Sequence, residues 1–203
     1  MSLFNRDVYE KISSKCAEYG ANLLVVTKTQ SVDAIQELYE YGQRHFGENK
    51  LQDALPKIEV LPKDIVWHFL GALQTNKVKK VIESFSCIHS VDRISLVEEL
   101  VKRACKIPVF LQVNVSGEKS KGGFSKEEFP KAVAAADELN VIGVMTMAEQ
   151  GASAERLRSI FALTKSMGIE AGLKECSMGM SEDYEVALEE GATIIRIGRA
   201  LFQ

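Results

Sequence analysis

The chain has 203 residues, of which 46% are hydrophobic and 26% charged, proportions typical of one soluble globular domain. The 25 basic and 28 acidic side chains give a net charge of −3, which argues against a nucleic-acid-binding surface or adsorption to anionic membranes. No apolar run is long enough for a membrane span, and no N-terminal segment is typical of a secretory signal. We therefore expect a single domain over residues 1–203.

The N-terminal segment predicts a helix. Phe4, Val8, Ile12 and Cys16 are spaced four apart, which places them on one helical stripe, and Gly20 is typical of a helix end. Residues 23–28 (LLVVTK) come next and are short, apolar and rich in branched side chains, which favours a buried strand.

Strand-like and helix-like segments then alternate to the end of the chain. Further strands are predicted at 44–49, 65–71, 87–92, 108–115, 141–147, 175–179 and 193–198. Helical segments are predicted at 32–42, 50–58, 76–85, 95–105, 129–139, 154–168, 182–191 and from 199 onward, and Pro56 is a candidate interruption of the second of these. Eight strands, each followed by a helical segment, predict a single (β/α)8 TIM barrel with an extra N-terminal helix. A doubly wound open sheet is the alternative, although no G-x-G-x-x-G follows the first strand.

The four cysteines, Cys16, Cys87, Cys105 and Cys176, are scattered along the chain. They form no C-x-x-C motif, and no histidine pair has metal-ligand spacing. This pattern predicts four reduced thiols, no metal site and a cytoplasmic protein. Cys176 is interpreted as structural rather than nucleophilic, because no local signature supports a reactive thiol.

Lys28 ends the first predicted strand, and the carboxyl ends of barrel strands form the active face. Because side chains alternate, Leu24, Val26 and Lys28 share one face of that strand. If that face is the barrel interior, burial favours the neutral amine, which forms Schiff bases with aldehydes. A lysine that snorkels outward at the strand end is the alternative.

Arg196 lies in the last predicted strand, TIIRIG, where it alternates with Ile194 and Gly198. An arginine in an otherwise apolar strand needs a partner. That partner is either a carboxylate of the barrel itself or a bound ligand toward which the guanidinium donates. The sequence leaves both interpretations open.

The last two βα loops carry a pattern typical of phosphate binding in barrels. Ser177, Gly179 and Ser181 follow the seventh strand, Ser181 fits a helix N-cap, and Gly198 precedes a final helical segment. Elsewhere, His68 in VWHFLG is either a general base or a hydrogen-bonded residue that shapes the pocket. The loop at 116–125 is interpreted as a solvated turn, with a mobile flap over the site as the alternative.

The sequence resembles the pyridoxal 5′-phosphate (PLP) homeostasis proteins, a family of PLP-binding proteins related in fold to the barrel domain of alanine racemase. The resemblance covers nearly the whole chain. It is carried by VVTKTQ, FGENKLQ, WHFLGALQTNK, SVDR, LQVNVSGEKSKGG, SMGMSEDYEVAL and TIIRIGRALF, in that order. Seven motifs in register are far more specific than any one of them.

This resemblance implies a role for each matching residue. Lys28 forms an aldimine with PLP, and Arg196 faces the pyridine nitrogen. The phosphate is held by Ser177, Ser181 and the backbone around Gly198 and Arg199. The residues near the cofactor ring are Asn49, His68 and Met145. At Arg199 many relatives carry threonine, so its guanidinium either pairs with the phosphate or turns outward.

The implied function is intracellular PLP (vitamin B6) homeostasis without efficient catalysis. A guanidinium only donates, so the pyridine nitrogen remains unprotonated and the cofactor becomes a weaker electron sink. The expected partners are PLP and apo PLP-dependent enzymes as recipients, and the expected state is a monomer. One alternative is a weak PLP-dependent amino-acid racemase. Another is a sugar-phosphate enzyme that forms a Schiff base at Lys28.

Overall fold

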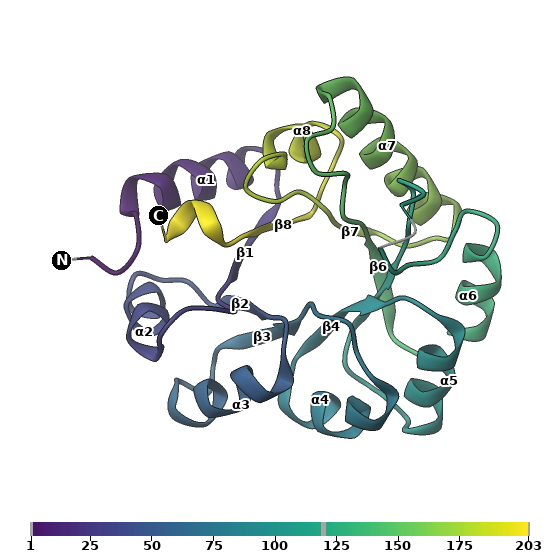
Figure 1. The fold of residues 1–203 in the computed structure, drawn as a ribbon, viewed down its shortest axis with the longest axis horizontal. Coiled ribbons are helices and arrows are strands. Elements are labelled where there is room, and N and C mark those ends of the chain that lie inside the picture. Colours follow the sequence, from purple (N-terminus) through teal and green to yellow (C-terminus); the bar gives the residue numbers. More distant parts are fainter. Residues whose placement is uncertain (1, 119–120, 203) are drawn as a thin grey trace.

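A computed structural model describes residues 2–118 and 121–202 of the chain. Its eight strands form a closed parallel barrel in which β8 pairs with β1 (Figure 1). The strands are β1 (Asn22–Val26), β2 (His45–Glu48), β3 (Val66–Phe69), β4 (Cys87–Val91), β5 (Val109–Gln112), β6 (Val141–Met145), β7 (Glu175–Ser177) and β8 (Ile194–Ile197). The predicted barrel is confirmed, and the open-sheet alternative is wrong because the β8–β1 ladder leaves no free edge.

Helices surround the barrel as an outer ring (Figure 1). They are α1 (Arg6–Glu18), α2 (Val32–Glu40), α3 (Leu51–Val60), α4 (Val78–Ser84), α5 (Ile94–Lys102), α6 (Phe129–Ala135), α7 (Ala154–Glu170) and α8 (Tyr184–Glu189), with the 3₁₀ helices η1 (Thr75–Lys77) and η2 (Arg199–Leu201). In the part of the chain that the structure describes, no helix combines the length and apolarity that crossing a bilayer requires.

Two helices differ from the sequence prediction. After β8 the described chain forms only the 3₁₀ turn η2, and α1 packs beside it, with the Asn5 amide donating to the Leu201 carbonyl at 2.8 Å (Figure 1). The extra N-terminal helix thus occupies the place in the ring next to β8. Pro56 does not interrupt α3, which continues to Val60.

The barrel interior holds a small apolar cluster that is separate from the larger core between strands and helices. Leu24, Cys87, Phe110, Met145 and Ile194 form this interior cluster. Leu24 therefore points inward while Val25, its neighbour, packs in the outer core, as strand alternation requires. The face predicted to carry Lys28 is consequently the interior face of β1.

Candidate functional site

A cavity of about 610 Å³ lies at the carboxyl end of the barrel. Its walls come from β1, β6 and β8, from the segments that follow β1, β2, β3, β5, β6, β7 and β8, and from Leu157 of α7. Among its lining residues are seven of the nine predicted site residues: Lys28, Asn49, Met145, Ser181, Arg196, Gly198 and Arg199. The other two, His68 and Ser177, lie buried in the barrel and do not line this cavity.

Lys28 lines the cavity from the first βα loop. Strand β1 ends at Val26, two residues earlier, so the Lys28 side chain is exposed at the cavity mouth. The expected burial of Lys28 is therefore wrong, although its predicted position on the active face is confirmed. Because the Lys28 side chain borders the cavity, the alternative of a side chain that snorkels outward does not describe it.

The backbone beside Lys28 is held by a buried polar network that the sequence did not predict. Thr27 is fully buried, and its hydroxyl donates to Glu48 Oε1 at 2.7 Å. Lys57, from α3, donates through Nζ to the Thr27 carbonyl and to Glu48 Oε1, each at 2.8 Å. These contacts fix the peptide that precedes Lys28. Lysine side chains on helices are ordinarily exposed, and no sequence pattern marks Lys57 as buried.

Arg196 is only 5% exposed and lines the cavity from β8. Its Nη1 donates to Ser177 Oγ and its Nη2 to the Thr146 carbonyl, each at 2.8 Å. Burial lowers the pKa of Arg196 to about 10, and the carboxylate of Asp183 opposes this shift. Among the described residues no carboxylate lies within ion-pair distance of Arg196, so the salt-bridge interpretation is wrong. A buried cation without a carboxylate partner suits an electron-rich ligand in the cavity.

The end of the cavity formed by the loops after β7 and β8 presents polar groups. The Ser181 hydroxyl accepts from the Ala200 amide of η2 at 3.4 Å. Gly198 passes so close to β1 that a Cβ there would lie 3.2 Å from the Val26 carbonyl oxygen. Arg199 turns outward and pairs with Glu182 at 2.7 Å on the surface.

The N-cap predicted at Ser181 is wrong, because α8 begins two residues later than that prediction requires. Its N-cap residue is Asp183, whose Oδ1 accepts from the Met180 amide. Burial raises the pKa of Asp183. Ser181 is thereby left at the cavity wall, where its hydroxyl is not committed to capping α8.

Asn49 and Met145 both line the cavity. Asn49 follows β2, and a Cβ at Gly71 would lie 1.8 Å from its carbonyl oxygen, so only glycine permits this approach. Met145 is 2% exposed and joins the interior cluster beneath the cavity. His68, below the cavity, is hydrogen-bonded to the rings of His45 and His89.

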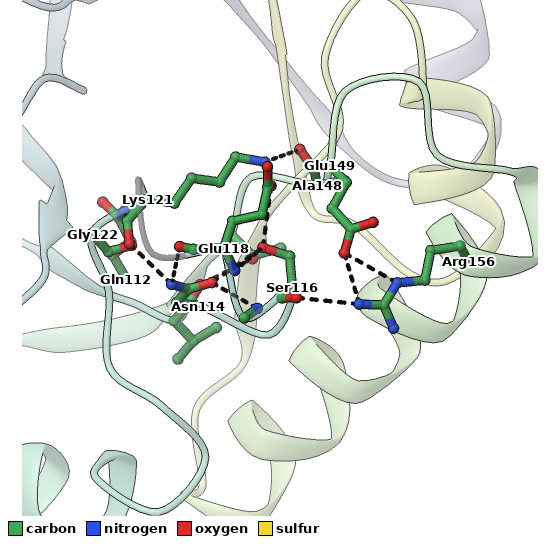
Figure 2. Close-up of polar contacts among 12 residues, drawn as sticks. Gln112, Asn114, Ser116, Glu118, Lys121, Gly122, Ala148, Glu149 and Arg156 are labelled. Carbon is green, nitrogen blue, oxygen red and sulfur yellow. Dashed lines mark hydrogen bonds and ion pairs between the residues drawn. The ribbon is translucent and has the colours of Figure 1, made fainter.

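Two loops beside the cavity were only partly anticipated from the sequence, and Figure 2 shows how they meet. Asn114 donates to the carbonyls of Glu118 and Lys121, and Lys121 Nζ reaches the Ala148 carbonyl at 2.7 Å (Figure 2). Lys121 also lines the cavity. Residues 119 and 120 of the predicted 116–125 loop lie outside the described residues, but its flanking parts are bound to neighbouring structure.

Arg156 completes this contact from α7. Its guanidinium donates to the Ser116 carbonyl at 3.2 Å and to Glu149 at 2.7 Å (Figure 2). The loop after β5 and the loop after β6 are thereby tied together at the cavity rim. The described residues of this loop are thus held by hydrogen bonds to neighbouring segments, while Gly117 and Gly122 are exposed.

The four cysteines are buried and unpaired by disulfides. Burial raises the pKa of Cys176 to about 11, which leaves its thiol protonated near neutral pH. This favours the structural interpretation of Cys176 over the nucleophilic one.

Comparison with known proteins identifies the family. The family model for the alanine racemase N-terminal domain matches residues 6–203. Proteins named pyridoxal phosphate homeostasis protein are 40% identical in Aquifex aeolicus (96% of this chain, 94% of the relative) and 42% identical in Pseudomonas aeruginosa (89% and 83%).

Solved structures agree with this assignment. PipY of Synechococcus elongatus with PLP bound superposes with a TM-score of 0.85 at 35% identity, covering 97% of this chain and all of that one. Alanine racemase of Bartonella henselae shares the fold, with a TM-score of 0.79 at 18% identity over 94% of this chain and 58% of that one. The chain therefore belongs to the family of pyridoxal phosphate homeostasis proteins, which is built on the alanine racemase N-terminal domain fold.

Proposed function

We propose that this protein binds PLP covalently through Lys28 and serves in intracellular PLP homeostasis. The observation that carries the proposal is that a primary amine and a buried guanidinium, Lys28 and Arg196, border one cavity. PLP supplies an aldehyde that condenses with a primary amine with loss of water, together with a pyridine nitrogen and a phosphate. Relatives at 40–42% identity carry the homeostasis name, and PipY is known with PLP bound.

The residues present fit this cofactor. A volume of about 610 Å³ is ordinary for a small-molecule site. Among the described residues Arg196 has no carboxylate partner, and we assign its free donors to the pyridine nitrogen. We assign the phosphate to Ser181 and the backbone at Gly198 and Arg199, which line the cavity. Asn49 and Met145 complete the set of residues that we assign to the surroundings of the PLP ring. We assign no phosphate contact to Ser177, because its hydroxyl is already bonded to Arg196 and His89.

We further propose that PLP is held and released rather than used for efficient catalysis. Arg196 only donates, so it leaves the ring nitrogen unprotonated and withholds the electron sink that α-carbon chemistry needs. The exposure of Lys28 at the cavity mouth supports exchange with a competing amine. Apo PLP-dependent enzymes are the proposed recipients. The single-domain organisation, the monomeric state and the cytoplasmic location stay predictions.

An absorbance titration tests covalent binding. Wild-type protein mixed with PLP is expected to develop the visible-violet band of a bound imine, whereas Lys28→Ala is expected to leave only the spectrum of free PLP. Lys79→Ala is the matched control, since Lys79 is a surface lysine whose side chain is 69% exposed, and it should behave as wild type. A wild-type protein that shows no band in excess PLP contradicts the proposal.

Turnover assays test the absence of efficient catalysis. With alanine or serine as substrate, the PLP-loaded protein is expected to racemise no faster than free PLP at the same concentration. Lys28→Ala mixed with the same amount of PLP is expected to give that same rate. A steady-state rate that depends on Lys28 instead favours the weak racemase. The sugar-phosphate enzyme is favoured only if PLP fails to bind and a sugar phosphate is trapped on Lys28.

A further inference from the structure

All three histidines of the chain lie in one line of hydrogen bonds through the barrel interior. His45 Nδ1 lies 3.0 Å from His68 Nε2, and His68 Nδ1 lies 2.9 Å from His89 Nε2. His89 Nδ1 in turn lies 2.8 Å from Ser177 Oγ, which accepts from Arg196 Nη1 at 2.8 Å. The line thus runs from the start of β2 across β3 and β4 to β7 and β8, where it ends at the cavity.

The inner members of this line are shielded from water. His89 and Ser177 are fully buried, and His68 is 5% exposed. The His89 ring stacks on Phe110, with ring centroids 4.3 Å apart. Burial lowers the pKa of His68 to about 3, with His45 adding to the shift. Since buried polar atoms cannot exchange their partners for water, each nitrogen depends on its neighbour in the line.

Arg196 determines which atom donates and which accepts in each hydrogen bond of this line. A guanidinium only donates, so Ser177 Oγ accepts from it. Among the described residues the one remaining partner for the Ser177 hydroxyl proton is His89 Nδ1, which therefore accepts. A neutral imidazole that accepts at Nδ1 carries its proton on Nε2. His89 then donates to His68 Nδ1, and His68 donates through Nε2 to His45 Nδ1.

A metal ion is the competing explanation for this cluster. The ligand atoms of His68, Cys87 and His89 lie within 4.8 Å of one another. Two imidazoles on one tetrahedral zinc have their nitrogens about 3.3 Å apart, given bonds of roughly 2.0–2.1 Å. The 2.9 Å between His68 Nδ1 and His89 Nε2 is instead an ordinary hydrogen-bond distance. Burial also raises the pKa of the Cys87 thiol to about 12, which disfavours the thiolate.

We propose that Ser177, His89, His68 and His45 are positioning residues for Arg196, acting as a hydrogen-bond chain of fixed direction. Ser177 and the Thr146 carbonyl hold the two terminal nitrogens of Arg196, and the histidines keep Ser177 turned as an acceptor. The guanidinium plane is thereby fixed with its remaining donors toward the cavity. This inference rests on the proposed function insofar as it assigns the pyridine nitrogen of PLP as the group that Arg196 meets.

Nitrogen NMR of histidine-labelled protein without PLP tests the chain directly. Because the protein has three histidines, each signal is assigned by one substitution. At pH 7.5 all three rings are expected to be neutral with the proton on Nε2, and the protein is expected to contain no stoichiometric metal. A proton on Nδ1 of His68 or His89, an imidazolium at either, or one bound zinc or copper per chain overturns the inference.

PLP binding tests the positioning role. Ser177→Ala is expected to weaken PLP binding about tenfold and to shift its absorbance band, because it removes one hydrogen bond to a charged group. His89→Leu is expected to weaken PLP binding and shift the absorbance band in the same way. His89→Asn keeps an acceptor near the place of Nδ1 and is expected to restore binding to within about twofold of wild type.

The control is Thr164→Val, which removes another fully buried hydroxyl, one that donates to Ile160 on the outer helix α7. It is expected to leave both the affinity and the absorbance band unchanged. If wild-type protein binds PLP and Ser177→Ala binds it equally well, the positioning role is wrong while the proposed function stands. If wild-type protein fails to bind PLP, the proposed function fails. The NMR measurement still decides whether the hydrogen-bond chain of Ser177 and the three histidines exists.

Discussion

Replacing Lys57 with methionine is expected to lower the free energy of unfolding by about 3–5 kcal/mol, the cost of leaving a buried charge without its partner. Lys57 Nζ lies 2.8 Å from Glu48 Oε1, and the Glu48 side chain is fully buried. The second oxygen, Glu48 Oε2, is buried without a hydrogen-bond partner among the described residues. Glu48 therefore depends on Lys57, and methionine supplies the volume of the lysine stem without the charge. Urea unfolding of the PLP-free protein measures the change.

Two further variants separate this effect from loss of packing. The double variant Glu48→Gln with Lys57→Met removes both charges and is expected to recover part of the lost stability. Arg103→Met breaks an exposed ion pair with Glu99 on α5 and is expected to cost at most about 1 kcal/mol. If Lys57→Met costs no more than Arg103→Met, the buried pair does not hold this part of the barrel. Because Lys57 also binds the Thr27 carbonyl, Lys57→Met should additionally weaken PLP binding at Lys28.

Acidification is expected to destabilise the protein well before most carboxylates titrate. The pKa of His68 is about 3, and burial holds the pKa of His89 well below its usual range. Below pH 6.5 the unfolded chain binds a proton at each of these histidines, and the folded protein does not. The unfolded state thus binds more protons, so the free energy of unfolding falls as the pH falls. For His68 alone the loss between pH 7.5 and pH 5 is about 2 kcal/mol.

The other titrating groups define the controls for this experiment. His45 is half-buried and its pKa is lowered by burial, so it acts in the same direction, whereas Asp183, whose pKa is raised, acts in the opposite one. Urea unfolding at several pH values gives the slope, and each buried histidine contributes up to about 1.4 kcal/mol per pH unit below pH 6. His89→Asn should reduce the slope of the free energy of unfolding against pH by the contribution of one histidine. A stability that is flat between pH 7.5 and pH 5 contradicts burial of neutral histidines.

The barrel and the positions of two candidate site residues could be predicted from the sequence because both depend on local periodicity. Short apolar strands alternate with helical segments, and eight such units close a barrel. The two-residue period of TIIRIG places Arg196 on the interior face with Ile194, and the same period orients Lys28 with Leu24. The serines and glycines of the last two βα loops indicated a candidate phosphate site there, and the family resemblance contributed the cofactor.

The polar networks could not be predicted, because they join residues that only the closed barrel brings together. His89 and Ser177 are 88 positions apart and meet across the barrel interior. Lys57 lies next to Pro56 on α3, where helical spacing indicates nothing about the Thr27 carbonyl that it reaches. Periodicity also cannot locate the last paired residue of a strand. Strand β1 ends at Val26, which is why Lys28 is exposed rather than buried.

Lys28 is the residue to which we propose that PLP becomes attached. Borohydride reduction of the PLP-loaded protein, followed by digestion and mass spectrometry, tests it most directly, because reduction makes the attachment permanent. Lys28 and Lys121 both border the cavity and are the two lysines that this measurement must distinguish. We expect the added phosphopyridoxyl mass on the peptide that contains Lys28. Its appearance mainly on Lys121, or on neither lysine, contradicts the account.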